Sequence, residues 1–180
     1  MLASLRDARS GPLGVATKTQ HPVTEFERIR LDLPHWQGPG ETYFLRFSLQ
    51  EDVRGDLART DIAPIIISCL RHFDGERYLL FDFVVMPDHV HCILKPLKQD
   101  NGYLNLFVIM DSLKHWTAVR INRVLRRRGA LWRREQYDHL LRNQADYLEK
   151  SRYIFNNPHA AGLVADPAKW PWWGVGKGVS

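Results

Sequence analysis

The distribution of apolar residues along the chain predicts alternating strands and helices. Residues 42–49 and 78–86 are rich in aromatic and β-branched side chains, which is typical of strands. A turn at Pro87 and Asp88 separates the second run from a third predicted strand, residues 89–94. Residues 57–73, between the first two runs, carry apolar side chains at helical spacing and predict a helix that Pro64 interrupts near its start.

The second half of the chain continues this alternation. Residues 104–127 have apolar positions at a helical period, and Gly129 stands where such a helix should end. Residues 131–141 are expected to be extended. Residues 145–156 are compatible with a further helix, which Pro158 should end because the residue before a proline disfavours the α conformation.

This order of elements predicts an α+β fold. Strand, helix, strand, strand, helix, strand is the order of a ferredoxin-like sandwich with an antiparallel sheet, here followed by an additional C-terminal helix. A chain of 180 residues is long enough for one hydrophobic core and short for two. We therefore expect a flexible N-terminal arm over residues 1–24, one domain over residues 25–175 and a tail over residues 176–180. Trp170, Trp172 and Trp173 are interpreted as an aromatic plug over the core.

The composition is that of a folded globular protein, with 44% hydrophobic and 25% charged residues. Cys69 and Cys92 are the only cysteines and lie outside any CxxC spacing, so neither a disulfide framework nor a thiolate zinc site is indicated. No apolar stretch is long enough to span a bilayer, and the N-terminus lacks the apolar core of a signal peptide. We expect a cytoplasmic protein without a membrane partner.

The formal net charge of +5 is concentrated in one part of the chain. Between residues 114 and 134 there are eight basic residues and no acidic one: Lys114, Arg120, Arg123, Arg126, Arg127, Arg128, Arg133 and Arg134. A basic stripe of this kind favours a polyanionic partner such as nucleic acid. The alternative is a solvated helix face without a binding role.

The sequence His89-Val90-His91 is the sharpest local signal for chemistry. Residues two apart in a strand point to the same face, so both imidazoles should converge while Val90 and Cys92 face the other way. Two neutral imidazoles on a rigid strand form half of a metal site. The alternative interpretation is a pair of strand histidines that are hydrogen-bonded to nearby carbonyl groups.

A helix near the C-terminus offers a nucleophile and a further ligand. Tyr153 and Asn157 are four residues apart, and therefore neighbours on one helical face if the last turn holds. The amide oxygen of Asn157 is a hard donor suited to Mg²⁺ or Mn²⁺. A free tyrosine has a pKa near 10, so its phenolate costs roughly 4 kcal/mol at neutral pH unless a divalent ion assists the attack. The alternative for Tyr153 is packing in the core.

These motifs together resemble a known family. Seven segments of the chain have the order and spacing seen in the REP-associated tyrosine transposases. They are Val84-Val85-Met86-Pro87-Asp88-His89-Val90-His91, Leu113-Lys114, Leu131-Trp132, Tyr137-Asp138-His139, Arg142, Tyr153-Ile154-Phe155-Asn156-Asn157-Pro158 and Ala161-Gly162-Leu163-Val164. These proteins are relatives of insertion-sequence transposases of the His-hydrophobe-His class. The similarity runs from about residue 42 to residue 172.

The resemblance implies a single-tyrosine DNA endonuclease or strand transferase. His89 and His91 would bind Mg²⁺ or Mn²⁺, Asn157 would be a further ligand, and Tyr153 would form a 5′-phosphotyrosine bond while freeing a 3′-hydroxyl. The family's substrate is single-stranded DNA with hairpins formed by repeated extragenic palindromes, which implies association with the nucleoid. The sequence leaves open a monomer or a homodimer with exchanged helices. Phosphates of the hairpin would be bound by Lys114, Arg120, Arg123, Arg126, Arg127, Arg128 and Arg142.

Several alternatives stay open at the level of the sequence. Arg142 could instead form an ion pair with Asp138 or Asp146, and Tyr137, Asp138 and His139 are interpreted as structural support. A hairpin-binding protein with little turnover would keep the same fold. A metallohydrolase of small molecules would use the two histidines but lacks a convincing carboxylate set beyond Asp88. The terminal Trp172-Trp173-Gly174 departs from the serine-bearing aromatic motif of relatives.

Overall fold

The computed structural model describes residues 22–25, 27–30 and 34–179, with backbone alone for residues 27–30 and 34–36. Residues 1–21 of the expected N-terminal arm lie outside the described residues. Val23, near the end of that arm, is buried and forms an isolated antiparallel bridge with Tyr103.

The central architecture is the expected ferredoxin-like sandwich. Its elements follow in the order β3 (Thr42–Ser48), α1 (Ala63–His72), β4 (Tyr78–Val85), β5 (His89–Pro96), α2 (Leu106–Val124) and β8 (Tyr137–Leu141). The strands lie side by side as β8-β3-β5-β4-β9, and every pairing in this sheet is antiparallel. The short strand β9 (Trp173–Val175) extends the sheet beyond β4.

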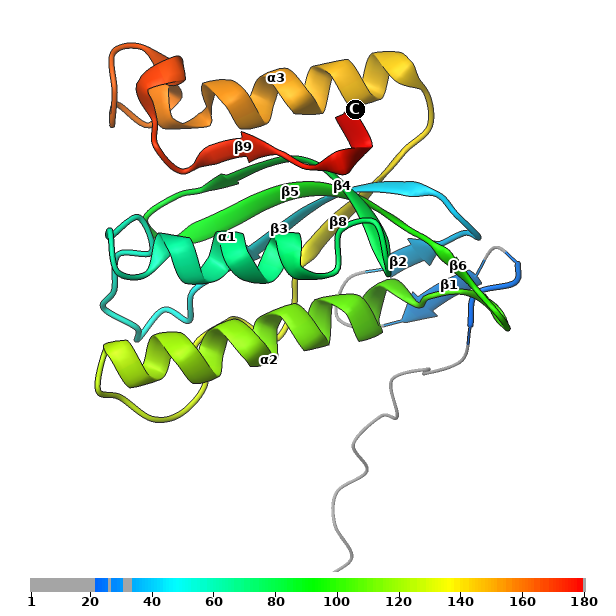
Figure 1. Ribbon diagram of the computed structural model, residues 1–180, viewed down its shortest axis with the longest axis horizontal. Coiled ribbons are helices and arrows are strands. Elements are labelled where there is room, and N and C mark those ends of the chain that lie inside the picture. The colour runs from blue at the N-terminus through cyan, green and yellow to red at the C-terminus, as the bar shows by residue number, and fades with distance from the viewer. Residues whose placement is uncertain (1–21, 26, 31–33, 180) are drawn as a thin grey trace, which may run out of the picture.

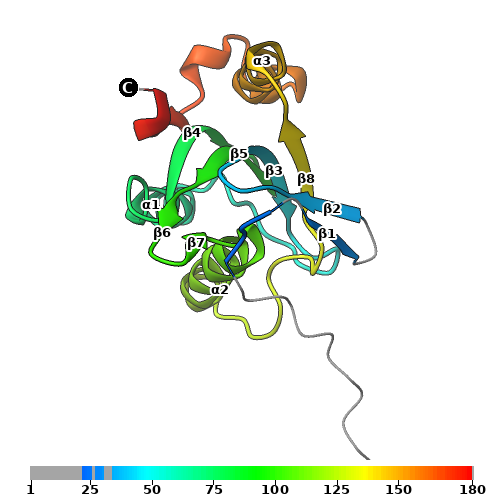
Figure 2. The same ribbon diagram turned by 90° about the vertical axis from the view of Figure 1, so that its right-hand side faces the viewer.

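Two helical layers cover opposite faces of the sheet (Figures 1 and 2). Helices α1 and α2 lie on one face, and α3 (Gln144–Ala160) lies on the other. The larger core lies under α1 and α2 and contains Leu45, Phe47, Val90 and Cys92. A smaller core lies under α3 and includes Phe44, Ile93 and Ile154. The alternation of β3 and β5 side chains between these two cores fixes which residues can face α3.

Small elements border the sheet. The pair β1 (Glu27–Arg30) and β2 (Pro34–Gln37) forms a separate two-stranded sheet, as does the pair β6 (Lys98–Gln99) and β7 (Gly102–Tyr103). Two short 3₁₀ turns, η1 (Pro167–Lys169) and η2 (Lys177–Val179), flank β9. The backbone N–H of Lys177 donates to the buried carboxylate of Asp74, so this part of the expected tail packs on the domain.

Prolines begin or accompany helices here rather than interrupting them. Helix α1 starts at Ala63 with Pro64 in its first turn, where the missing N–H has no intrahelical partner to lose. The expected start at residue 57 and the expected interruption at Pro64 are therefore wrong.

Asn105 begins α2 by accepting a hydrogen bond from the backbone N–H of Phe107 at 2.9 Å.

Helix α3 continues past the expected end at Asn157. It runs through Pro158 to Ala160. Gly162 then adopts φ +71°, and its N–H donates to His159 while the N–H of Leu163 donates to the carbonyl of Pro158. This Schellman-type arrangement satisfies the last carbonyls and marks the physical end of the helix. The preference of pre-proline residues for extended backbone is overridden, and Asn157 stays in helical conformation.

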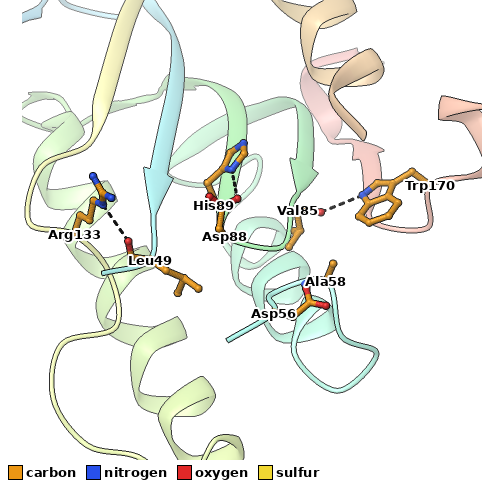
Figure 3. Close-up of polar contacts among 8 residues, drawn as sticks. All are labelled: Leu49, Asp56, Ala58, Val85, Asp88, His89, Arg133 and Trp170. Atoms are coloured by element: carbon orange, nitrogen blue, oxygen red, sulfur yellow. Dashed lines mark hydrogen bonds and ion pairs between the residues drawn. The ribbon is translucent and has the colours of Figure 1, made fainter. Parts of the chain in front are cut away.

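The three C-terminal tryptophans cover parts of both cores, as expected for an aromatic plug. Trp172 packs against the larger core, and Trp170 and Trp173 pack against the smaller one. The Trp170 indole N–H also donates to the carbonyl of Val85 at 3.1 Å (Figure 3). Among the described residues no helix is long and apolar enough to cross a membrane.

Candidate active site

Strand β5 directs His89 and His91 toward the face that α3 covers. Their neighbours Val90 and Cys92 are buried in the opposite core. The two imidazole rings meet edge to face, with centroids 4.7 Å apart. Burial raises the pKa of the Cys92 thiol to about 12, so this thiol stays protonated as well as facing away from the histidines. The convergence expected from the His-hydrophobe-His spacing is present.

The imidazole of His91 lies in the interior, between strands β3 and β5 and helix α3. Its ring stacks on Phe44 of β3 with a centroid distance of 5.0 Å, and the residue is only 2% exposed. Within the described part of the chain, neither ring nitrogen has a hydrogen-bond partner. Burial, assisted by the nearby His89 and Arg46, lowers the pKa of His91 to about 3. A neutral imidazole whose two nitrogens are orphaned is suited to accept a ligand.

His89 is oriented by a carboxylate. Its Nδ1 lies 2.7 Å from Oδ1 of Asp88, so that nitrogen donates to the carboxylate (Figure 3). Burial lowers the pKa of His89, and the hydrogen bond with Asp88 opposes this shift. The side chain of Asn157 also lies close enough to raise the pKa of His89 slightly. Asp88 therefore fixes the orientation of the His89 ring, and Nε2 of His89 faces away from this carboxylate.

Tyr153 reaches the histidine pair from α3 of the same chain. The centroids of the Tyr153 and His91 rings are 5.3 Å apart, and those of Tyr153 and Phe44 are 5.9 Å apart. Tyr153 is 50% exposed, whereas the adjacent Ile154 is fully buried and anchors the helix. One face of the phenol thus packs beside the histidines while the side chain stays accessible to a large substrate.

A buried carboxylate attaches α3 to the sheet. Asp82 of β4 accepts a hydrogen bond from the Tyr147 hydroxyl at 2.9 Å and another from the Ser151 hydroxyl at 3.1 Å. Burial and the Asp82 carboxylate raise the pKa of Tyr147 to about 12, so its hydroxyl remains a donor. Both donors precede Tyr153 on α3, and the contacts therefore set the position of the helix over β5. No sequence motif indicated this contact, because Asp82 and α3 are brought together only by the tertiary fold.

Three further residues border the site and were not identified from the sequence as its members. Arg46 of β3 pairs with His91 across the sheet, and Tyr137 of β8 pairs with Arg46 on its other side. Lys150 of α3 places its ammonium group 5.8 Å from the centre of the Phe44 ring. The carboxylate of Glu149 raises the pKa of Lys150, which keeps it charged. The alternation of strand 42–49 would have placed Arg46 on the Phe44 face.

His89, His91 and Asn157 provide some, but not all, of the ligands that a divalent cation needs. His89, His91 and Asn157 bring two imidazole nitrogens and an amide oxygen to one end of β5 and α3, and the orphaned nitrogens of His91 fit a ligand role. No group of three or more His, Cys, Asp or Glu side chains suited to a metal occurs within the described ranges. Because α3 extends past Asn157, this side chain lies on the same helical face as Tyr153. Its amide oxygen is thus needed as a third ligand beside the two imidazoles.

The structure does not bring the basic stripe to these residues. Arg120, Arg123, Arg126 and Arg128 are exposed, and α2 lies on the sheet face opposite α3 (Figures 1 and 2). Arg127 is half-buried and donates to the side chain of Asn122 and the carbonyl of Ala130.

Lys114 departs from the expectation of a phosphate contact. It is buried, and its ammonium group donates to Oε1 of Gln136 at 2.8 Å and to the carbonyls of Arg133 and Arg134. These bonds tie α2 to the segment that leads into β8, so Lys114 has a structural role. The sequence could not show this because a lysine in a basic run reads as exposed.

Arg142 lies in the turn between β8 and α3, on the side of the sheet that carries Tyr153. Its side chain is exposed, and its backbone N–H donates to Oδ2 of Asp146 at 3.0 Å. Asp146, one of the two acidic partners considered for its guanidinium, thus accepts a hydrogen bond from its backbone. Arg142 is the expected phosphate contact that lies nearest in sequence to α3.

Comparisons with known proteins give one consistent result. No protein-family model matches the chain. A Haemophilus influenzae protein named as a REP-associated tyrosine transposase is 29% identical over 143 residues, which cover 74% of this chain and 78% of the relative. An Escherichia coli REP-associated tyrosine transposase is 23% identical over 73% of this chain and 74% of its own length. The resemblance recognised in the motifs is therefore confirmed.

The fold is shared with a solved structure described as a REP-associated tyrosine transposase bound to a REP hairpin. The TM-score is 0.63 at 23% identity, and the match covers 75% of this chain and 76% of that one. The chain therefore shares the fold of that protein over the matched three quarters of its length.

Proposed function

From its homology to the REP-associated tyrosine transposases, we propose that this chain is a metal-dependent endonuclease and strand transferase of hairpin-bearing single-stranded DNA. The observation that carries the proposal is the contact between Tyr153 and the unpartnered imidazole of His91 within one chain. A nucleophile, a candidate ligand set and an accessible face occur together there.

Tyr153 is the proposed nucleophile. Its phenol loses a proton to solvent, its Oη forms a bond to the phosphorus, and the bond from phosphorus to the 3′ oxygen breaks. The 3′ oxygen takes up a proton and leaves as a hydroxyl, so the 5′ side stays attached to Tyr153. The charged Lys150, held near Tyr153 on the preceding turn of α3, stabilises negative charge that develops on the phenol oxygen.

His89, His91 and Asn157 would hold Mg²⁺ or Mn²⁺. A divalent ion supplies Lewis acidity toward a phosphate oxygen and neutralises charge that develops during displacement. Asp88 orients His89 through its Nδ1, which leaves Nε2 as the donor atom of that residue. The low pKa of His91 keeps its imidazole neutral and able to bind a cation at pH 7.

DNA phosphates would be bound by the exposed arginines of two regions. Arg142 lies just before α3, on the same side of the sheet as Tyr153, and Arg120, Arg123, Arg126 and Arg128 lie on or after α2 on the opposite face. A hairpin that contacts both regions must extend around the edge of the sheet formed by β8. Contacts of this kind supply sequence-independent and salt-sensitive affinity.

The proposal is tested by incubating the protein with end-labelled DNA that carries a palindromic hairpin and single-stranded flanks. With Mg²⁺ or Mn²⁺ we expect cleavage and a covalent protein–DNA adduct, both lost with a chelator and in Tyr153→Phe. Tyr103→Phe, which removes the hydroxyl of a tyrosine in β7 and not in α3, is the matched control and should still form the adduct.

Two results would contradict the proposal. Normal cleavage by Tyr153→Phe would exclude the phosphotyrosine step. Tight hairpin binding without metal-dependent cleavage, across a panel of hairpins and flanks, would instead identify a hairpin-binding protein without turnover.

A further inference from the structure

A row of three side chains crosses the sheet next to the proposed nuclease site. Tyr137 of β8, Arg46 of β3 and His91 of β5 are successive partners in the strand registers. Directly paired residues on neighbouring strands point to the same face. All three therefore lie on the face of Phe44 and α3, and not on the face that α1 and α2 cover.

The outer two members of this row are open to solvent. Tyr137 is 49% exposed and Arg46 is exposed, whereas His91 is buried beneath Tyr153 and beside Phe44. The rings of Phe44 and Tyr137 meet edge to face, with centroids 6.3 Å apart and an angle of 72° between their planes. Tyr137 is thus an exposed ring whose orientation is supported by a buried neighbour, unlike a freely rotating surface tyrosine.

The charge of Arg46 acts on three titratable groups of this site. It favours the ionised carboxylate of Asp88 and disfavours positive charge on the imidazoles of His89 and His91. The same repulsion opposes a cation between them. No ion pair of Arg46 with a carboxylate is found in the described part of the chain. An anionic ligand beside the histidines would remove this repulsion.

We propose that Tyr137 and Arg46 form a binding subsite for one unpaired nucleotide of single-stranded DNA next to the phosphate that Tyr153 attacks. The base stacks on Tyr137, and its phosphate binds the Arg46 guanidinium between Tyr137 and His91. An aromatic ring beside an arginine provides these two contacts without selecting a base. The inference rests on the proposed function, because it names how the cleaved strand is held at that site.

The subsite predicts an effect that depends on single-stranded flanks. Binding is measured by fluorescence anisotropy in EDTA, so no cleavage occurs, with a blunt hairpin and with the same hairpin carrying a 5′ or 3′ extension. Tyr137→Ala should weaken binding of one extended hairpin about ten-fold, while Tyr137→Phe, which keeps the ring, changes it less than about two-fold. Both variants should bind the blunt hairpin as the wild type does.

Arg46 provides an independent arm of the same test. Arg46→Gln should weaken the same extended hairpin and lower the slope of log affinity against log salt by about one. Controls far from the row are Trp116→Ala, which removes another exposed aromatic, and Arg77→Gln, whose guanidinium lies over the ring of Phe73. Both controls should keep the wild-type difference in affinity between the extended and the blunt hairpin.

The outcomes separate this inference from the proposed nuclease activity. Equal weakening for blunt and extended hairpins, or no weakening in Tyr137→Ala and Arg46→Gln, would overturn the subsite even if the protein cleaves DNA. Extension-dependent weakening without any cleavage would support the subsite and contradict the nuclease. Thermal unfolding of each variant without DNA identifies any loss caused by misfolding, and Arg46→Gln then decides if Tyr137→Ala does not fold.

Discussion

His91 is only 2% exposed, and its ring lies between those of Phe44 and Tyr153. The spacing of His89 and His91 was sufficient to predict that their side chains share a face, because strand geometry fixes that relation locally. The burial of His91 under Phe44 and Tyr153 depends on contacts between β3, β5 and α3, which no local pattern contains. Arg46 escaped notice for the same reason, since only the strand register places it beside His91.

A buried imidazole without partners should cost stability, and more so in acid. The pKa of His91 is about 3 in the folded state, below the ordinary value of 6.5. Between these two pH values the unfolded chain therefore binds a proton at His91 that the folded chain does not bind. Stability should therefore fall as the pH decreases from about 6.5 toward about 3. In the presence of a chelator, His91→Leu should unfold at a urea concentration equal to or higher than that of the wild type. Its free energy of unfolding should also decrease less between pH 7 and pH 4.

Urea titrations of the metal-free wild type and His91→Leu at several pH values measure this difference. His89 has a lowered pKa as well, so a part of the pH dependence should persist in the variant. An unchanged pH dependence in His91→Leu would show that His91 is not held neutral by burial.

Lys114 illustrates a residue whose type misled the sequence interpretation. Its ammonium group donates to the Gln136 side chain and to the carbonyls of Arg133 and Arg134. Lys114→Met should destabilise the fold by about 1–3 kcal/mol, because buried acceptors lose their donor. The salt dependence of DNA binding should remain that of the wild type. A lower salt slope with unchanged unfolding free energy would restore Lys114 as a phosphate contact.

Helix α3 determines whether the site is assembled. Its existence and the shared face of Tyr153 and Asn157 followed from sequence, but its extension through Pro158 did not. The Gly162 turn and the carbonyl acceptors His159 and Pro158 determine where it ends, and these outweigh the local preference at Asn157. Strand β9 was likewise missed, because three residues of an edge strand carry too short a pattern.

The contact of Asp82 with α3 should control cleavage more than binding. Asp82→Ala removes the acceptor for Tyr147 and Ser151, which hold the helix before Tyr153. We expect faster hydrogen–deuterium exchange in α3 and a cleavage rate reduced about ten-fold or more, since misplacement of a nucleophile is costly. Affinity for the hairpin in EDTA should stay close to that of the wild type.

A matched control for this variant is Asp166→Ala, which removes the cap of the nearby turn η1. It should leave exchange in α3 before Tyr153 unchanged. If Asp82→Ala cleaves at the wild-type rate while α3 exchanges faster, the position of the helix does not limit catalysis.

The basic stripe and the site of His91 and Tyr153 lie on two different surfaces of the molecule. The order of elements in the sequence could not show this. The ferredoxin-like order of elements was predicted from periodicity, and it was confirmed by the sheet order and the shared fold. The basic stripe and the histidine pair were expected to serve one DNA, yet α2 and α3 lie on opposite sheet faces (Figure 2). The side that each helix covers depends on the connection to the sheet and not on its charge pattern.

This separation predicts that binding and cleavage can be altered independently. Arg123→Glu combined with Arg128→Glu should weaken hairpin binding and lower its salt dependence, because both side chains are exposed on the α2 side. At saturating DNA the rate of adduct formation should remain near that of the wild type. Measuring affinity and single-turnover rate in parallel distinguishes this result from a loss of both, which would place these arginines at the reacting phosphate.

The central claim is that Tyr153 becomes covalently attached to DNA beside the histidine pair of its own chain. It is tested most directly by trapping the reaction with a labelled hairpin substrate, digesting the adduct with protease and nuclease, and locating the modified residue by mass spectrometry. The account predicts a phosphate-linked nucleotide on Tyr153 in the presence of Mg²⁺ or Mn²⁺. A nucleotide linked to any other residue, or cleaved DNA without a covalent adduct, would contradict it.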